Sequence, residues 1–443
     1  MKKNLLFLEL NECDFSYFLY GANKYNFPKI KYFISKKKIK IYTLDKKEGL
    51  NLDPWVQWVS IHTGVNSDTH KTYRIGQKLN IKIKQIWDIL AQKKISSTVW
   101  GAFNSNIRSK KKIDLFFPDP WSFTQKTYPS SFNQYLKLPR YYALSYPSSK
   151  KFKLIKYALL FFKKLVFSNN FWYLFKNSFI ITYFFIKSNF KSFNLYFFLD
   201  LASLLIVKKN LIHKRSDFVI VAINCFAHYQ HNFWDSKKYE YIYFWYLNEM
   251  IKITNTIAIP YNSIIISNGF SQKKIKEVFH LRPKKLDNFL TTLDINFISA
   301  KSNMTSGFTI FFKNNKNKME VINKLRNIII FDYPLFEVEN YKNKNSIFCK
   351  FHITLKKKIN SFNNINKSNY RSYFYEPVKK INGSNFLDKL FFDRLFEQLI
   401  FMKSTSVHKP NGLIYYSGSF SFSKIKKKIL NHEIFNYIIK YFI

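Results

Sequence analysis

Short apolar runs bounded by turn residues alternate along this chain with segments of helical periodicity. The alternation is typical of a mainly parallel sheet covered by helices on both faces, because successive parallel strands need a crossover that is usually a helix. We therefore predict an α/β fold of this kind. The expected strands are residues 4–11, 97–103, 217–224, 263–268 and 412–417, and the expected helices include residues 81–92 and 385–400.

The pattern divides the chain into a core and an insertion. Residues 1–129 and 215–443 carry the alternating pattern and are expected to form the α/β core. Residues 130–214 instead hold aromatic and Lys-rich helical stretches such as KLIKYALLFFKKLVF, which predict a helical cap. We expect the apolar faces of the cap to pack on the core or on a partner chain, and peripheral contact with a membrane surface is the alternative.

The formal net charge of +45 comes from Lys residues spread as short runs over every segment, among many Asn, Ile, Phe and Tyr. Short runs of this kind are typical of solvated faces, so we expect no nucleic-acid partner. Nucleic-acid binding through the positive charge is the less favoured alternative, and it predicts an affinity that depends strongly on salt.

Cysteine use and hydropathy bear on the compartment. Cys13, Cys225 and Cys349 lie far apart and form no CxxC motif, so the sequence implies neither a structural zinc site nor a disulfide framework. Glu9 interrupts the first apolar run, and no small-residue cleavage site follows it. The uncharged stretches fall short of the roughly 18 to 20 residues that span a bilayer. We therefore expect a cytoplasmic protein without a signal peptide or transmembrane segment.

The segment DPWVQWVSIHTGVNSDTH predicts a helix that opens a site. Asp53 is a suitable N-cap, and Pro54 suits the first helical position because its missing N–H has no partner there anyway. The helix is expected to run toward Thr63. Its amino end would favour an anion, since the free N–H groups and the helix dipole point to it.

Four motifs follow one another in a recognisable order. Thr63 and Gly64 are followed after five residues by His70, and the later segments are NCFAHYQH (224–231), ISNGF (266–270) and HKPNG (408–412). With these motifs the chain resembles the alkaline-phosphatase superfamily, specifically its type I phosphodiesterase and nucleotide pyrophosphatase branch. The resemblance covers most of the chain outside the insertion. It implies an alkaline-phosphatase-like fold, hydrolysis or transfer of a phosphoester, and a divalent metal, either zinc or manganese.

The departures from the family pattern concern its reactive residues. Pro54 stands at the nucleophile position, Asn11, Asn224 and Asn268 stand where the family has Asp, and Gly269 and Lys71 replace a His and a Gly. Two neighbouring divalent cations need several carboxylates to offset their repulsion, and Asn supplies only a neutral carbonyl. These residues therefore suit the usual two-zinc site poorly. A water activated by a histidine, with or without one metal, is the simplest replacement for the nucleophile.

The candidate site residues fall into two groups. His408 and His228 are the candidate catalytic groups, and together with His231 they are the candidate metal ligands. The expected ligand-binding residues are Asn11, Asp53, Trp55, Trp58, Asp119, Asn224 and Asn268. Each of these residue types also has a purely structural alternative. The Asn residues and Asp119 could be turn residues, the histidines could be hydrogen-bonded residues of helices, and the Trp side chains could pack in the core.

Two function hypotheses remain open. The first is a phosphodiesterase- or phosphatase-like hydrolase or transferase, acting on a phosphoester that is linked to a nucleotide, a sugar or a lipid. The alternative is a catalytically inactive member of the same fold, which would bind a glycan or a small phosphorylated ligand through Asn and Trp side chains.

Overall fold

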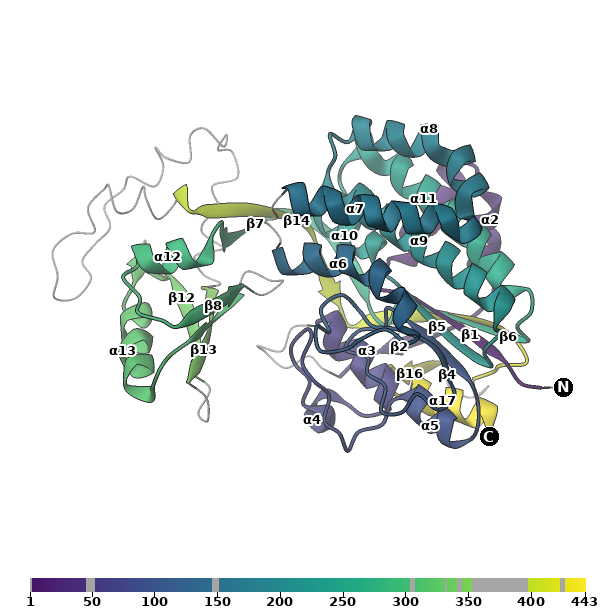
Figure 1. Ribbon diagram of the computed structural model, residues 1–443, viewed down its shortest axis with the longest axis horizontal. Helices are drawn as coiled ribbons and strands as arrows, with labels where there is room; N and C mark the ends of the chain where they lie inside the picture. The colour runs from purple at the N-terminus through teal and green to yellow at the C-terminus, as the bar shows by residue number, and fades with distance from the viewer. Residues whose placement is uncertain are drawn as a thin grey trace. The chain divides into compact units, whose positions relative to one another are not determined.

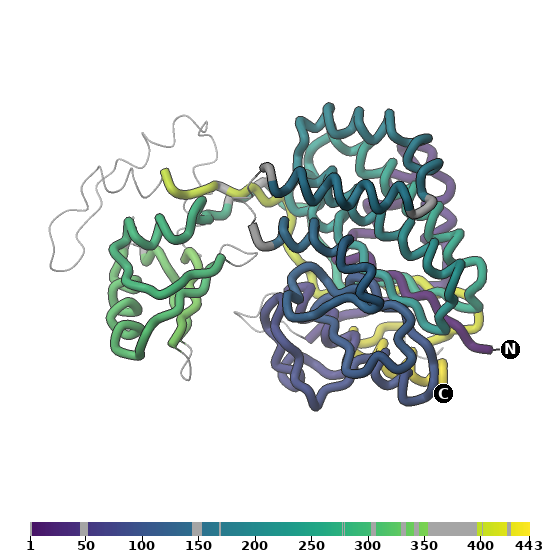
Figure 2. Tube along the Cα trace, in the orientation of Figure 1, coloured from purple at the N-terminus to yellow at the C-terminus, as the bar shows by residue number. Residues whose placement is uncertain are grey.

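A computed structural model describes residues 2–44, 52–145, 151–302, 307–330, 333–340, 345–352, 397–422 and 427–443 (Figures 1 and 2). The chain forms two units, the first made of Met1–Ile275 and Thr405–Ile443 and the second of Lys276–Ser404. It leaves the first unit along β7 (Ser271–Pro283) and returns along β14 (Leu399–Lys409), and these two strands pair with each other.

The first unit is built on an eight-stranded sheet with the order β16-β2-β15-β6-β1-β5-β3-β4. The central strand β1 pairs in parallel with β5 and β6, and β3 pairs in parallel with β5 and β4. Only β15 runs antiparallel to its neighbours β6 and β2 within this sheet as described. The strands are β1 (Leu5–Leu10), β2 (Lys37–Tyr42), β3 (Ser97–Trp100), β4 (Ile113–Phe117), β5 (Phe218–Ile223), β6 (Ser263–Ser267), β15 (Asn411–Gly418) and β16 (Lys428–Leu430).

Both faces of the sheet are covered by helices, so β1 is buried along its whole length (Figure 1). Leu6, Leu8 and Leu10 belong to one hydrophobic cluster, and Leu5 and Phe7 to the other. A strand that is apolar on both sides is what a parallel sheet between helices requires. The predicted fold class, α/β with a mainly parallel sheet between helices, is confirmed.

The helices divide between the two faces (Figure 1). The first cluster draws on α1 (Phe15–Lys24), α2 (Pro28–Phe33), α10 (Cys225–Phe233), α11 (Lys237–Ala258) and the helices of the predicted cap. The second cluster draws on α3 (Pro54–Thr63), α5 (Ile86–Gln92) and α17 (Glu433–Phe442), and the short helix α4 (Ser67–His70) follows α3. The five expected strands correspond to β1, β3, β5, β6 and β15, and α5 lies within the expected helix 81–92.

Helix α3 begins at Pro54 with Asp53 as its N-cap residue, as the sequence predicts. Every residue of α3 is buried, which agrees with a helix that is apolar around most of its circumference. The Asp53 side chain itself makes no capping hydrogen bond. The helix ends at Gly64, whose φ of 73° favours glycine, and a Cβ there would lie 2.7 Å from the Phe435 ring of α17.

The predicted cap is helical and belongs to the first unit. Its elements are η1 (Ser130–Phe132), α6 (Asn133–Ser145), α7 (Lys151–Leu165), η2 (Val166–Asn170), α8 (Phe171–Lys187) and α9 (Ser192–His213). Within the described residues, no helix combines the length and the apolar character that crossing a membrane would require.

The second unit is a four-stranded antiparallel sheet with the order β12-β13-β9-β8. The unit lies within residues 215–443, which the sequence assigns to the predicted core. A cluster around Phe289, Phe308 and Phe336 fills the unit. Residues 385–396 of the expected helix 385–400 lie outside the described part, and Leu399 already begins β14. The elements are α12 (Leu286–Thr292), β8 (Ser299–Ser302), β9 (Gly307–Phe311), α13 (Asn315–Arg326), β10 (Ile329–Ile330), β11 (Tyr333–Pro334), β12 (Phe336–Asn340) and β13 (Ser346–Phe351).

A buried acid–base pair joins the sheet to α3 and gives a test of the fold. Glu9 Oε1 lies 2.6 Å from His62 Nε2, and neither side chain is exposed. Removing one partner of such a pair leaves the other unpaired in the core. We expect His62→Ala to lower the free energy of unfolding by about 3–5 kcal/mol.

Urea unfolding followed by tryptophan fluorescence measures this effect in the first unit, because all eight Trp residues precede Lys276. The matched control is His213→Ala at an exposed histidine, for which a change within about 0.5 kcal/mol is expected. Equal losses in the two variants would contradict the role given to the pair.

Candidate metal centre

The parallel strands bring several chain segments to one edge of the sheet. In the register of the sheet, Glu9 of β1 lies beside Ala222 of β5 and Ser267 of β6. The antiparallel β15 begins at the same edge, since its Ile414 pairs with Ser267. His408, near the end of β14 and just before β15, is therefore delivered to the carboxyl ends of β1, β5 and β6, where ligands collect in open α/β sheets.

Glu12 lies two residues beyond β1 in a backbone conformation that is uncommon for its type. Its φ is 56°, and its N–H donates to the carbonyl of Asn268 at 3.1 Å. Left-handed backbone at a residue other than glycine is sparsely populated and concentrates at functional sites. The turn places the Glu12 carboxylate, which is only 3% exposed, at the edge of the sheet.

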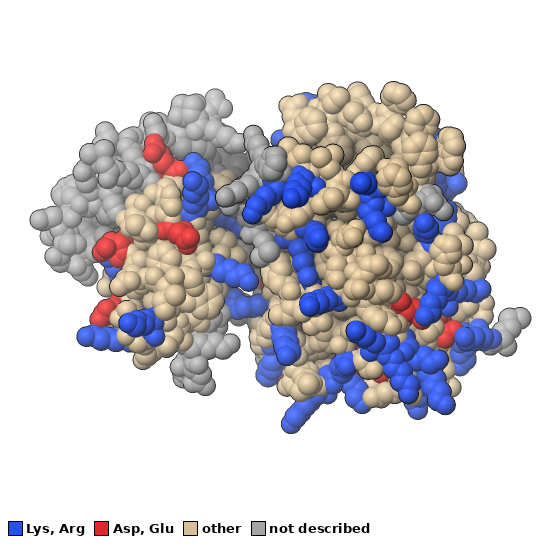
Figure 3. All heavy atoms as spheres, in the orientation of Figure 1, with Lys and Arg blue, Asp and Glu red and all other residues tan. Residues whose placement is uncertain are grey.

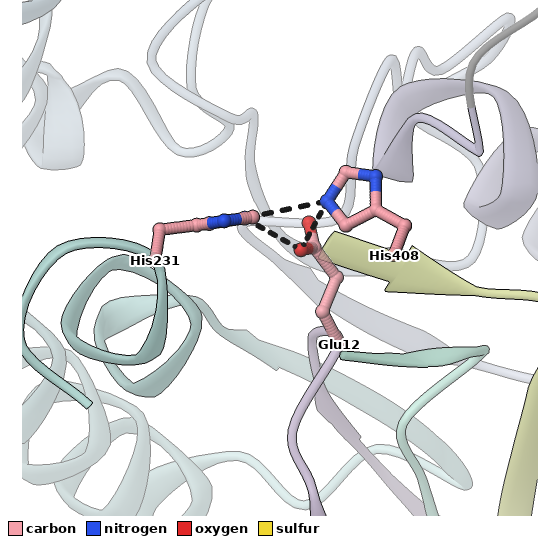
Figure 4. A group of neighbouring side chains, drawn as sticks. All are labelled: Glu12, His231 and His408. Atoms are coloured by element: carbon pink, nitrogen blue, oxygen red, sulfur yellow. Dashed lines mark hydrogen bonds and ion pairs between the residues drawn. The ribbon is translucent and has the colours of Figure 1, made fainter. Parts of the chain in front are cut away.

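Glu12, His231 and His408 form a compact group of three potential metal ligands (Figure 4). Glu12 Oε2 lies 2.9 Å from His231 Nε2 and 2.7 Å from His408 Nε2, and the two Nε2 atoms are 3.3 Å apart. One ligand atom of each residue lies within 4.8 Å of the others. The three side chains come from the end of β1, from α10 and from β14 and point toward a common point (Figure 4).

The charges within this group stabilise one another. Burial alone would raise the pKa of Glu12, but the charges and hydrogen bonds of His408 and His231 hold that pKa well below its usual range. Burial alone would lower the pKa of His408, and the neighbouring Glu12 carboxylate raises that pKa instead. A buried carboxylate is thus kept ionised, and an ionised carboxylate is what a cation needs.

Three further side chains hold the ligands in place. Gln272 Nε2 donates to Glu12 Oε2 at 2.8 Å, and Asn11 Nδ2 donates to Glu12 Oε1 at 3.0 Å. Ser406 Oγ donates to Gln272 Oε1 at 2.7 Å and lies 3.1 Å from His231 Nδ1. Such contacts orient metal ligands and fix the tautomer of a histidine.

The cap contributes to the position of α10, which carries His231. Asp200 of α9 accepts hydrogen bonds from the N–H groups of Asn224 at 2.8 Å and Cys225 at 2.7 Å. These are groups at the start of α10 that have no acceptor within their own helix. A carboxylate at a helix start also interacts favourably with the helix dipole.

The three Asn residues at the family's Asp positions form hydrogen bonds that occupy their oxygens. Asn11 Oδ1 accepts from the Trp58 indole at 2.7 Å, Asn224 Oδ1 from Asn11 Nδ2 at 2.7 Å, and Asn268 Oδ1 from the Leu413 N–H at 2.8 Å. None of these amides carries the negative charge that two adjacent divalent cations require. The residues present therefore do not fit the two-metal site that the family resemblance implies.

The group of Glu12, His231 and His408 does fit a single divalent cation. Two imidazoles and one carboxylate are a donor set found around catalytic zinc and around non-haem iron. The carboxylate is ionised and the side chains already converge within the range of one ion. Within the described residues this is the one such cluster of three His, Cys, Asp or Glu groups.

The structure brings two of the three predicted histidine ligands together and places the third apart. His228 stacks on Tyr196 with ring centroids 4.1 Å apart and planes 9° apart, and its Nε2 lies 3.1 Å from Asn224 Nδ2. Burial lowers the pKa of His228 to about 4. His228 is therefore a neutral neighbour of the group and lies outside it.

The predicted ligand-binding residues take different positions. Asp53 is near the group: burial raises the pKa of Asp53 to about 7, while the charge of His408 lowers this pKa and that of Glu12 raises it. Trp55 and Trp58 are buried, and the Trp55 indole donates to the Tyr73 carbonyl at 3.1 Å.

Asp119 is also buried and organises its own loop. Its carboxylate accepts from the N–H groups of Asn104, Trp121 and Ser122 at 3.0–3.1 Å. This is the turn role that the sequence left open beside a ligand-binding one.

Sequence reasoning missed Glu12, which supplies the only carboxylate of the group. The family pattern points to Asn11, the residue just before it. The available signal was an acidic residue directly after an apolar strand, where side chains gather at the edge of the sheet. Gln272 and Ser406 were missed too, because polar residues of common types carry no motif.

Comparison with known proteins yields distant structural likenesses. No family model matches the chain, and no curated protein matches it. Phosphonoacetate hydrolase from Sinorhizobium meliloti 1021 is similar at a TM-score of 0.40 and 10% identity, over 100% of this chain and 96% of that chain. Human ectonucleotide pyrophosphatase/phosphodiesterase 5 is similar at a TM-score of 0.43 and 8% identity, over 99% of this chain and 94% of that chain. Alkaline phosphatase from the Antarctic bacterium TAB5 is similar at a TM-score of 0.39 and 11% identity, over 100% of this chain and 98% of that chain.

These proteins are members of the superfamily that the sequence motifs resemble.

The low pKa of His228 has a measurable consequence. A histidine with a lowered pKa in the folded state takes up its proton more readily in the unfolded chain, so it favours unfolding as the pH falls from about 6.5 toward 4. We expect the imidazole signals of His228, assigned by comparison with His228→Gln, to stay those of the neutral ring at pH 5 in an NMR titration. A midpoint near 6.5 would contradict the buried, neutral state.

Proposed function

We propose that this protein is a metal-dependent phosphoester hydrolase that works with a single divalent cation, zinc or manganese, held by Glu12, His231 and His408. The observation that carries the proposal is the convergence of these three side chains around one ionised, buried carboxylate. The resemblance of the sequence motifs to phosphodiesterases supports the phosphoester as substrate. A nucleotide-, sugar- or lipid-linked phosphoester fits the proposal equally.

A cation bound to these residues would polarise a phosphoryl oxygen and lower the pKa of a bound water. The residues of the chain supply the remaining functions. Asp53, whose pKa burial raises to about 7, is suited to exchange a proton near neutral pH. The amino end of α3, which begins one residue later, favours the negative charge of a phosphate.

Water is the proposed nucleophile, because the side chains of α3 and the nearby thiols are poorly suited to attack. Pro54 has no nucleophilic atom, and the hydroxyls of Ser60 and Thr63 are buried and donate to carbonyls within α3. Burial raises the pKa of Cys13 and of Cys225 well above the usual value for a thiol, which keeps both protonated.

A second candidate function is binding without catalysis, and the Asn network favours it. Asn11, Asn224 and Asn268 stand at the positions of the family's Asp residues and hydrogen-bond to other parts of the chain. A protein of this kind would hold a phosphorylated ligand or a glycan at the same edge of the sheet and release it unchanged. Metal binding without turnover of any ester would favour this function.

Metal content is the first test of the proposal. We expect the full-length protein, purified without chelator or metal-binding tag, to bind about one equivalent of zinc or manganese. Glu12→Gln and His408→Ala should each lose most of this metal, whereas the exposed control His213→Ala should keep it. Elemental analysis by mass spectrometry provides the measurement, and a wild-type protein that stays metal-free after soaking in both ions would refute the metal site.

The residues around the ligands give a graded prediction. Gln272→Ala removes a donor to Glu12 Oε2 and a partner of Ser406, so the affinity for the metal should fall by about 10- to 100-fold without loss of the site. Calorimetric titration of the metal-stripped protein with zinc measures this change. An unchanged affinity would mean that Gln272 does not position the carboxylate.

Turnover is measured with three probes: p-nitrophenyl phosphate, bis-p-nitrophenyl phosphate and p-nitrophenyl sulfate. We expect hydrolysis of at least one phosphate ester by the metal-loaded protein, and Glu12→Gln should lower kcat/KM by about 100-fold or more. His213→Ala should retain the wild-type value. Hydrolysis that Glu12→Gln leaves unchanged would place the activity elsewhere on the protein or in a contaminant.

A further inference from the structure

Helices α7 and α8 carry apolar side chains on an outer face as well as on the face that packs against the core. In α8, Leu174, Ile181 and Phe184 are buried, while Trp172 and Phe179 are 76% and 84% exposed. The exposed apolar residues of α8 recur at helical spacing along one stripe, which lies opposite the buried one at 100° per residue. Together with α7 and η2, the exposed set is Ile155, Leu159, Leu160, Phe162, Phe167, Phe171, Trp172, Phe175, Phe179, Tyr183 and Ile186.

This set, the α7–α8 face, accounts for a large share of the exposed large hydrophobic residues that the described part of the chain contains. Isolated exposed apolar residues are ordinary on protein surfaces, but a stripe that runs along a whole helix, as on α8, is typical of an interaction site. Seven of its members are aromatic. Such side chains are favoured at the boundary between water and lipid, where an apolar ring meets polar headgroups.

The charge around the α7–α8 face has one sign. Between Asp119 and Asp200 the sequence contains twelve Lys and Arg residues and no Asp or Glu. Over α7 and α8, the visible surface shows Lys and Arg but no acidic atoms (Figure 3). Lys153, Lys156, Lys163, Lys164 and Lys176 are exposed on the same two helices. In a chain with 27 acidic residues in 443, a stretch of eighty without any is a local feature and not a consequence of overall composition.

An apolar stripe flanked by cations fits an anionic lipid surface better than a second copy of this chain. Two copies meeting through this face would bring their lysines together, and like charges across an interface are unfavourable. Anionic headgroups attract lysines by about 1 kcal/mol each, and aromatic and aliphatic side chains bury beneath the headgroups. Because none of the described helices suits a membrane crossing, the face would lie in the interface.

We propose that the α7–α8 face docks the protein onto anionic membranes, with Trp172 and Phe179 entering the headgroup region and the lysines holding the lipid phosphates or carboxylates. The docking brings the cap to the bilayer as a peripheral contact. It is independent of whether the metal centre is catalytic, since the two rest on different residues.

Vesicle flotation tests the proposal with the full-length protein. We expect it to float with vesicles of phosphatidylcholine mixed with phosphatidylserine and to bind far less to phosphatidylcholine alone. Trp172→Ser combined with Phe179→Ser should lower the partition coefficient by about tenfold or more, and Lys163→Glu combined with Lys164→Glu should also weaken binding to the anionic vesicles. Raising the salt should weaken binding of the wild type.

The matched control places the same kind of change elsewhere. Ile81→Ser combined with Ile298→Ser removes two exposed apolar side chains outside the α7–α8 face, and its binding should equal that of the wild type. Equal binding by all variants, or equal binding of the wild type to both kinds of vesicle, would overturn the proposal. The proposal would also be overturned if the wild-type protein did not bind vesicles but formed a dimer through this face. In that case the wild type would be a dimer in solution, and the variant that combines Trp172→Ser with Phe179→Ser would be a monomer.

Tryptophan fluorescence provides a readout that does not depend on variants. Of the eight Trp residues, all of which are described, Trp172 is the one that is strongly exposed. Its emission should shift to the blue when anionic vesicles are added and should be quenched by brominated lipid. No shift and no quenching with either kind of vesicle would rule out insertion of Trp172 into the headgroup region.

Discussion

The parallel pairing of β1 with β5 and β6 is the constraint on which the rest of this structure depends. A strand that is buried on both faces has to be apolar, and β1 satisfies this everywhere except at Glu9, which meets His62 of α3. The same pairing collects the segments that follow each strand at a single edge. Glu12 and α10 meet there because β1 and β5, the strands that precede them, run in the same direction, and His408 joins them because the antiparallel β15 begins at this edge.

The balance of charge at this edge explains why one cation suits the protein and two do not. Glu12 is the single carboxylate among the three converging ligands, and two imidazoles share its charge. Asn11 and Asn224 contribute hydrogen bonds in place of negative charge. An amide network of this kind is satisfied without any ion, whereas the Glu12 carboxylate keeps its negative charge at this edge. The group is therefore simpler than the two-metal site that the family resemblance implies.

Much of the fold was predictable because strand burial and helix signals are local properties of the sequence. The apolar run of β1 and the Asp53–Pro54 start of α3 are examples, and both appear in the structure. The second unit was not predicted, because no sequence pattern distinguishes its short antiparallel strands from the strands and loops of the core. At the centre, His408 was named through its motif, whereas His231 was named only as a neighbour of the motif residue His228, which lies outside the group. Glu12 was not, because its position depends on a left-handed turn that no composition signal announces.

The hydrogen bonds of Asp200 make the cap and the centre inseparable. Asp200 belongs to α9, yet its carboxylate holds the first N–H groups of the helix that carries His231. A chain trimmed of its cap would lose this acceptor, and α10 would begin without it. The cap therefore has a structural role in the first unit. A variant with a shortened cap needs another acceptor for the N–H groups of Asn224 and Cys225 at the start of α10. A cap grafted from another protein would need an acidic side chain at the corresponding turn of its last helix.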